Sequence, residues 1–307
     1  MSLKRESDNK SFDYRVEAIR IVIMLAVIAA HIYLYAIWLG KRNIVTFLLA
    51  IKNDLNFLSI FLPIAFCMGI LIFFSGFVYG IRNYFEDSLT KEAYVEHIKK
   101  RFLRLYPSYY LALFTVFIAK VIVCYPMKLT PISIILDLTN IWSLFFISPG
   151  GDIWPEGWFI AAVFWLAVIY PFIRRLMENN KKYIYILILF GFSLKIFLII
   201  IGLTGYAYTH PFAWLGEFCW GILYGKNISE KGKSLSLADT KTKKAIIKMG
   251  DRVLPMYLAH SAVIVFISFR PPFWEYIVAF ISILLLSEIF YRLLDYKDKI
   301  LKKKGII

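Results

Sequence analysis

Cysteine is scarce in this sequence and is never spaced for metal binding or disulfide formation. The three cysteines, Cys67, Cys124 and Cys219, all lie in apolar segments, and no Cys-x-x-Cys pair occurs. We therefore expect no disulfide framework and no metal site. A Gly-x-Ser-x-Gly motif is also missing, which excludes the nucleophile elbow of serine hydrolases.

Acidic residues are few, with 21 Asp and Glu against 36 Lys and Arg and a net charge of +15. The basic residues fall in short clusters between apolar runs, as the positive-inside rule predicts for cytoplasmic loops, so nucleic-acid binding is disfavoured. The polar stretch 1–15 precedes the first apolar run, and no small-residue cleavage pattern follows that run. We expect the first span to remain uncleaved.

No internal repeat of fixed period is visible, which weakens a reading as an inverted-repeat transporter. What the chain does have is apolar residues: 60% of its 307 residues are hydrophobic and 18% are aromatic, in long runs. This composition predicts an all-α, polytopic transmembrane helix bundle that forms a single domain over 1–307.

The first apolar run, 14–35, is long enough to cross a bilayer and contains one histidine. Arg20 and His31 are eleven residues apart, close to three helical turns, so they share one face with His31 about 16 Å deeper. Ionisable groups inside membrane segments usually face protein or water and serve a function. The helix face that carries Arg20 and His31 is therefore the first candidate for a catalytic site.

The other clear spans are expected at 59–81, 103–123, 158–173, 183–203, 212–225, 252–269 and 273–294. If segment 125–156 does not cross, the basic loop 226–248 and the basic tail 295–307 lie in the cytoplasm with the N-terminal tail. We therefore expect an external or re-entrant segment there and both termini inside. The total is about eight spans, or about ten if residues 44–58 and 132–148 each cross.

Several short motifs occur in one order along the chain: EAIR at 17–20 with His31, FFSGF at 73–77, KRFLRLYP at 100–107, GWFIAAVFWLAVIYP at 157–171, GEFCWGILYG at 216–225 and LPMYLAH at 254–260. Their order and spacing resemble the integral-membrane acyltransferase family 3. Members of that family typically O-acetylate bacterial surface carbohydrates with acyl-CoA.

The resemblance implies roles for individual residues. His31 matches the family's essential histidine and Arg20 its partner arginine, while Arg101 and Arg104 match paired arginines that would bind acyl-CoA. Trp158 fits the family's Trp segment, although many members carry a Glu five residues later where this chain has Val163. No role is transferred to that position. Asp295, rather than Glu, occupies what looks like the acidic site closing the last span.

Each of these residues also has a simpler, non-catalytic interpretation. Arg20 could pair with Glu17 one turn earlier, or extend to the interface as a snorkelling side chain. Arg101 and Arg104 could serve only topology or lipid headgroups. Ser75 is a pocket-lining candidate, but the glycine beside it more often marks close helix packing.

Three further aromatic and histidine positions also carry two readings. Trp158, with its neighbours Trp142 and Trp154, fits either an interfacial aromatic belt or a sugar-stacking surface. Tyr257 and His260 either line the same cavity as His31 or only pack within the bundle. The remaining histidines, His97 and His210, are expected in a basic loop and a surface loop.

The resemblance implies a multi-pass O-acyltransferase of a cell membrane, namely the prokaryotic plasma membrane. The expected donor is acetyl-CoA or another acyl-CoA, and the expected acceptor is a surface or lipid-linked carbohydrate. Membrane lipids are the other expected partner. The rival reading is a transporter or flippase with an intramembrane His and Arg pathway.

Overall fold

A computed structural model describes most of the chain. It covers residues 14–40, 55–81, 90–125, 127, 129–142, 144–147, 151–230, 241–267 and 273–305, with side chains given outside 33–40, 55–63, 266–267 and 273–276. The prediction for segment 44–58 therefore lies largely outside the described residues, as do most of the N-terminal tail and the middle of the basic loop.

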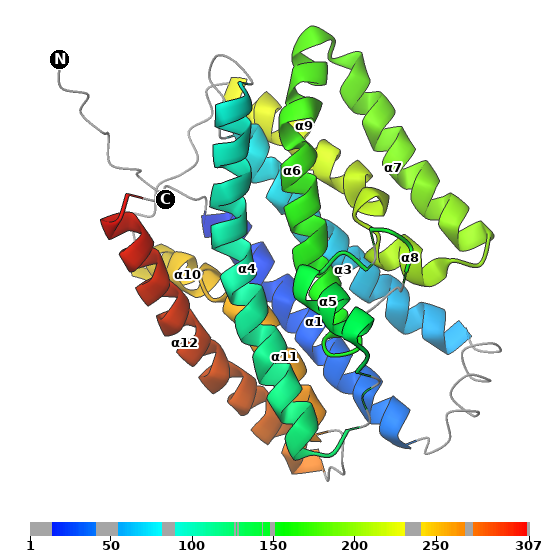
Figure 1. The fold of residues 1–307 in the computed structure, drawn as a ribbon, viewed down its shortest axis with the longest axis vertical. Helices are drawn as coiled ribbons and strands as arrows, with labels where there is room; N and C mark the ends of the chain where they lie inside the picture. Colours follow the sequence, from blue (N-terminus) through cyan, green and yellow to red (C-terminus); the bar gives the residue numbers. More distant parts are fainter. Residues whose placement is uncertain are drawn as a thin grey trace.

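The described part is a bundle of inclined helices, and no strand occurs in it (Figure 1). The long helices are α1 (Tyr14–Gly40), α3 (Leu55–Ile81), α4 (Lys91–Ile122), α6 (Trp158–Asn179), α7 (Lys182–Ile200), α9 (Leu215–Glu230), α11 (Val253–Ile267) and α12 (Phe273–Lys303). The short elements are α5 (Pro131–Thr139), η1 (Pro155–Gly157), α8 (Thr204–Thr209), η2 (Pro211–Trp214) and α10 (Lys241–Gly250). The all-helical prediction is confirmed over these residues.

Five of the described helices are long and apolar enough to cross a membrane, namely Ile64–Ile81, Lys91–Ile122, Pro155–Asn179, Lys182–Ile200 and Ile277–Lys303. The outer helices carry large exposed apolar side chains, such as Leu189 and Ile200 on α7 and Leu285 on α12. Such continuous apolar surface is stable against lipid rather than water. The chain is therefore a helical membrane protein.

α3 and α9 pack closely against each other, and glycines on both helices make the approach possible. A Cβ at Gly76 would overlap the carbonyl oxygen of Phe218, and a Cβ at Gly221 would overlap that of Phe73. Small residues four apart permit this kind of backbone contact in membranes. The packing reading of the glycine in FFSGF is confirmed.

Contacts from several helices gather the basic clusters at one end of the bundle, which we call the basic end. Lys297 near the end of α12 donates to the carbonyl of Leu103 on α4. Lys181 before α7 pairs with Glu230 at the end of α9. Figure 1 shows α4 starting and α12 ending toward the same side. Lys226 and the basic stretches at 241–248 and 295–303 lie in helices, namely α9, α10 and α12.

Among its described residues, segment 125–156 has one α-helix, α5, before the 3-10 turn η1 that leads into α6. α5 has nine residues and ends at Asn140, whose backbone is left-handed with φ 55°. At about 1.5 Å per residue it spans about 13 Å, which is too short to cross a bilayer. Thr130 and Ser133 cap its start reciprocally.

Two expectations, one for the tryptophans near this segment and one for His97 on α4, are wrong. Trp142, Trp154 and Trp158 are at most 4% exposed, so they form neither a lipid-facing belt nor an open stacking surface. His97 does not lie in a loop, because α4 already begins at Lys91 with Thr90 as its N-cap. A capped polar helix can project from the apolar layer, so the loss of hydrophobicity before Arg104 did not mark a helix end.

Candidate active site

α1 runs without interruption past both of its predicted site residues. Arg20 and His31 therefore share nearly one face and are about 16 Å apart along the axis. His31 is partly exposed, and its Nδ1 lies 2.8 Å from the carbonyl oxygen of Val27. Because a carbonyl oxygen only accepts, Nδ1 carries the proton of the neutral ring and Nε2 presents its lone pair.

His260 on α11 lies against His31. The two ring centroids are 5.0 Å apart and the ring planes meet at 59°. His260 is fully buried, and its Nδ1 bonds to the carbonyl oxygen of Tyr257. Its Nε2 has no hydrogen-bond partner among the described residues. The structure thus brings His31 and His260 together, as one reading of the sequence expected.

Tyr257 fixes the position of this second histidine. Its hydroxyl donates to the carbonyl oxygen of Glu156, just before α6. One residue beyond His260, Ser261 accepts a hydrogen bond from Trp154 Nε1 at 3.0 Å. Both anchors lie in the 151–157 stretch, so α11 is held on either side of His260.

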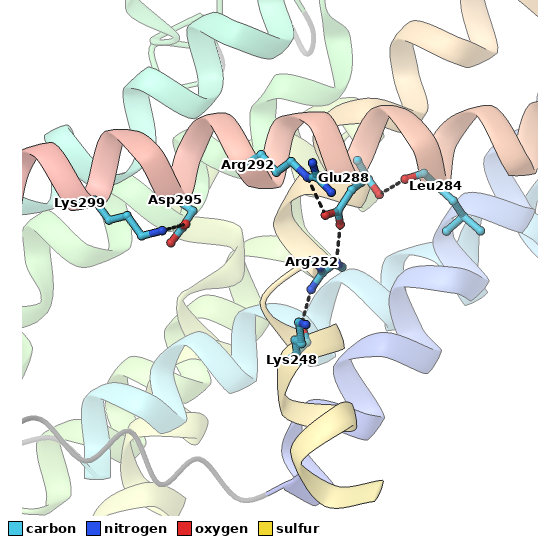
Figure 2. Close-up of polar contacts among 8 residues, drawn as sticks. Lys248, Arg252, Leu284, Glu288, Arg292, Asp295 and Lys299 are labelled. Atoms are coloured by element: carbon cyan, nitrogen blue, oxygen red, sulfur yellow. Dashed lines mark hydrogen bonds and ion pairs between the residues drawn. The ribbon is translucent and has the colours of Figure 1, made fainter. Parts of the chain in front are cut away.

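Charged residues form a layer between the histidines and the basic end. Figure 2 shows Arg252, just before α11, bonded to Glu288 on α12, which also bonds Arg292. Arg252 is eight residues before His260, about 12 Å along a helix. The corresponding distance from Arg20 to His31 is about 16 Å. Along both α1 and α11, the histidine therefore lies about 12–16 Å from the arginine of this charged layer.

Arg20 itself forms an ion pair with Glu17, with Nη1 2.8 and 2.9 Å from the two carboxylate oxygens. Glu17 is 5% exposed and Arg20 30% exposed in their side chains. Glu17 also lies against Gly250 at the end of α10. Arg20 thus forms the ion pair with Glu17 that one hypothesis from the sequence expected, and this pair connects α1 to α10.

Arg101 and Arg104 lie one turn apart on α4, toward the basic end. Arg101 stacks over the ring of Tyr79, with 4.6 Å between the guanidinium carbon and the ring centroid. The carbonyl oxygen of Tyr79 accepts a hydrogen bond from Tyr170 on α6. Arg101 therefore leans toward the α3 and α6 side, while the Arg104 side chain is exposed.

The remaining predicted pocket residues lie apart from the histidine pair in their described contacts. Trp158 stacks on Trp214 with 5.7 Å between ring centroids and also contacts Tyr208. Ser75 is partly exposed on α3, in the stretch that packs against α9. Neither residue has a described contact with His31.

Sequence reasoning missed three polar features. Lys195 on α7 forms an ion pair with Glu217 on α9, and its Nζ lies 3.6 Å from the Trp214 ring centroid. His97 bonds through Nε2 to the carbonyl of Ala167, and Arg174 is buried while paired with Glu178. A lysine and a glutamate inside apolar runs were the available signal for the first.

The segment before α6 is attached to α4 through buried polar groups. The hydroxyl of Tyr109 donates to the carbonyl of Asp137, and one carboxylate oxygen of Asp137 accepts from the Ile153 N–H at 3.0 Å. Burial raises the pKa of Asp137 from an ordinary value of 3.8 to about 6, and the Ile153 hydrogen bond opposes this rise only in part. Asn140 donates to the carbonyl of Gly157, so the start of α6 is fixed by the same segment.

The fold and these residues define a class: a helical membrane protein with a histidine pair beneath a charged layer. A family model described as an acyltransferase domain matches residues 13–238, well over half of the chain. The protein therefore belongs to acyltransferase family 3 and is a membrane acyltransferase. No curated protein and no solved structure matched the chain. The matched residues include His31 and Arg101, whereas His260 lies beyond them.

Proposed function

We propose that this protein transfers an acyl group, most simply acetyl from acetyl-CoA, to a hydroxyl of a cell-surface or lipid-linked carbohydrate. The observation that carries the proposal is the state of His31 on α1: its Nδ1 is committed to the carbonyl of Val27, which leaves Nε2 available as a base. A neutral imidazole suits general-base chemistry near neutral pH. The family match supplies the reaction class.

In the proposed reaction, His31 Nε2 takes the proton of the acceptor hydroxyl as its oxygen attacks the thioester carbonyl. The new O–C bond forms, the C–S bond breaks, and the thiolate leaves and takes the proton from His31. Arg101 and Arg104 are the proposed holders of the CoA phosphates, because guanidinium groups one turn apart on a helix can bind phosphate oxygens together. No metal enters this scheme.

We further propose that the basic end faces the cytoplasm of a prokaryotic cell and that the protein is a multi-pass plasma-membrane enzyme. The gathered lysines and arginines support this orientation through the positive-inside rule. Acyl-CoA is a cytosolic donor, and this orientation places the two arginines on its side. The far end, with segment 125–156, would then face the acceptor.

The test is acyl transfer by the purified full-length protein in detergent or liposomes. Radiolabelled acetyl-CoA and an extracted surface-carbohydrate fraction are the substrates, and free CoA and labelled carbohydrate are the readouts. We expect His31→Gln to lower transfer by at least about 100-fold, the range that general-base catalysis contributes. We expect Arg101→Gln mainly to raise the KM for acetyl-CoA. Full activity of a folded His31→Gln protein would overturn the mechanism.

A transporter or flippase is the second candidate. The observation that favours it is the Lys195 and Glu217 ion pair between α7 and α9, since paired charges inside apolar helices often mark transport pathways. A carrier would move substrate across liposomes without cleaving acetyl-CoA. If CoA is released only when the acceptor is present, the protein is an acyltransferase and not a transporter.

A further inference from the structure

We propose that His260 is a positioning residue for His31: its Nε2 accepts a hydrogen bond from the Nε2–H of His31 in the interval between proton uptake from the acceptor hydroxyl and proton release to the leaving thiolate. This inference rests on the proposed function and assigns a role within the same site. It starts from the contact between the two rings, whose centroids are 5.0 Å apart. At that separation the edges of the two tilted rings are in contact, so a small movement of either ring can bring the two Nε2 atoms within hydrogen-bonding distance.

The hydrogen-bond inventory of the two rings leads to this role. Each ring gives its Nδ1 proton to a backbone carbonyl, His31 to Val27 and His260 to Tyr257. Each Nε2 is then an acceptor, so the two neutral rings cannot bond to each other. When His31 is protonated, its Nε2 becomes a donor and His260 Nε2 remains an acceptor. A hydrogen bond between the two rings can therefore form only while His31 is protonated, which is the state that the reaction produces.

The burial of His260 makes a hydrogen bond from His31 energetically important. His260 is 0% exposed, and its Nε2 has no partner among the described residues. A buried acceptor without a partner carries a free-energy cost in the resting state. The cost is relieved when a donor reaches it, and the nearest ring able to become a donor is His31. An interaction made only as charge develops lowers the barrier instead of tightening substrate binding.

The anchoring of α11 keeps the His260 ring in place for this purpose. Tyr257 is bonded to the Glu156 carbonyl, and Ser261 to Trp154. These two bonds flank His260 and tie it to the stretch that begins α6. A ring held by such neighbours needs only a small adjustment when the proton arrives.

The experiment compares four variants of the full-length protein in the acetyl-transfer assay. His260→Leu removes the acceptor at similar size, His260→Gln places an amide oxygen near the former Nε2, and His260→Asn is a shorter amide that does not reach it. Met256→Leu is the control, because Met256 is also buried on α11. Folding is checked by gel filtration.

We expect His260→Leu and His260→Asn to lose about 10- to 100-fold in kcat, the range for a hydrogen bond to a charged group, with little change in the KM for acetyl-CoA. We expect His260→Gln to retain most of the wild-type kcat. Equal kcat in the Gln and Asn variants, or an unchanged kcat in His260→Leu, would overturn the role. If His260→Leu does not fold, the comparison of Gln with Asn still decides. Failure of the wild-type protein to transfer acyl groups would instead overturn the proposed function.

Discussion

Removing Arg20 should destabilise the protein for a reason that can be separated from catalysis. Arg20 is paired with Glu17, whose side chain is 5% exposed. Arg20→Gln leaves that carboxylate buried without its counter-charge, which costs about 3–5 kcal/mol in buried pairs. Since Arg20 keeps 30% exposure, we expect the lower value, about 3 kcal/mol, or about a 100-fold fall in the folded-to-unfolded ratio.

The double variant Glu17→Gln/Arg20→Gln removes both charges and should recover most of the lost stability, because neutral amides leave no buried charge. Thermal unfolding in detergent can be followed with a thiol-reactive dye. Cys219 is 0% exposed and becomes reactive on unfolding, above a constant signal from the exposed Cys124.

Activity of the double variant then separates the two readings of Arg20. Recovery of both stability and acyl transfer would show that Arg20 acts only as the partner of Glu17. Recovery of stability without activity would assign Arg20 a direct part in binding or charge stabilisation. If Arg20→Gln is as stable as the wild type, the reasoning from burial is refuted.

Two further predictions concern stability. The buried Asp137 binds its proton more tightly in the folded state than in the unfolded state, so its contribution is fully present below about pH 3.8 and is lost as the pH rises through about 6. The melting temperature should therefore fall over this interval by an amount equivalent to at most about 3 kcal/mol, and Asp137→Asn should flatten the dependence; an unchanged slope would contradict it. Gly221→Val should lower the melting temperature or prevent folding, because its Cβ meets the Phe73 carbonyl and overpacking costs about 1–3 kcal/mol or more. Wild-type stability of Gly221→Val would refute the close packing of α3 on α9.

The helices could be predicted from the sequence where apolar residues are continuous over a bilayer thickness. The runs at 59–81 and 183–203 correspond to α3 and α7 with small differences at the ends. The polar start of α4 could not be found in this way, because capping at Thr90 and helix propensity extend it beyond the apolar layer. Similarly, α12 continues to Lys303 through residues that looked like a tail.

The candidate site was predictable only within single helices. Arg20 and His31 share a face because helical periodicity fixes it, and Arg101 and Arg104 are one turn apart for the same reason. The contact of His31 with His260 depends on how α1 packs against α11, and local spacing does not encode that packing. The burial of Trp154 depends likewise on α4 and α11, so its aromatic character alone suggested a membrane interface.

The depth of the histidine pair places a geometric condition on the proposed donor. His31 and His260 lie about 12–16 Å from the layer that contains Arg20 and Arg252. An acyl-CoA held by its phosphates at the basic end must therefore insert its extended pantetheine arm between the helices. A thioester on such an arm could reach His31 while the charged nucleotide stays outside the apolar layer. With the nucleotide outside the apolar layer and the thioester inside it, α1 would need a cation, Arg20, near the basic end and a base, His31, three turns further along.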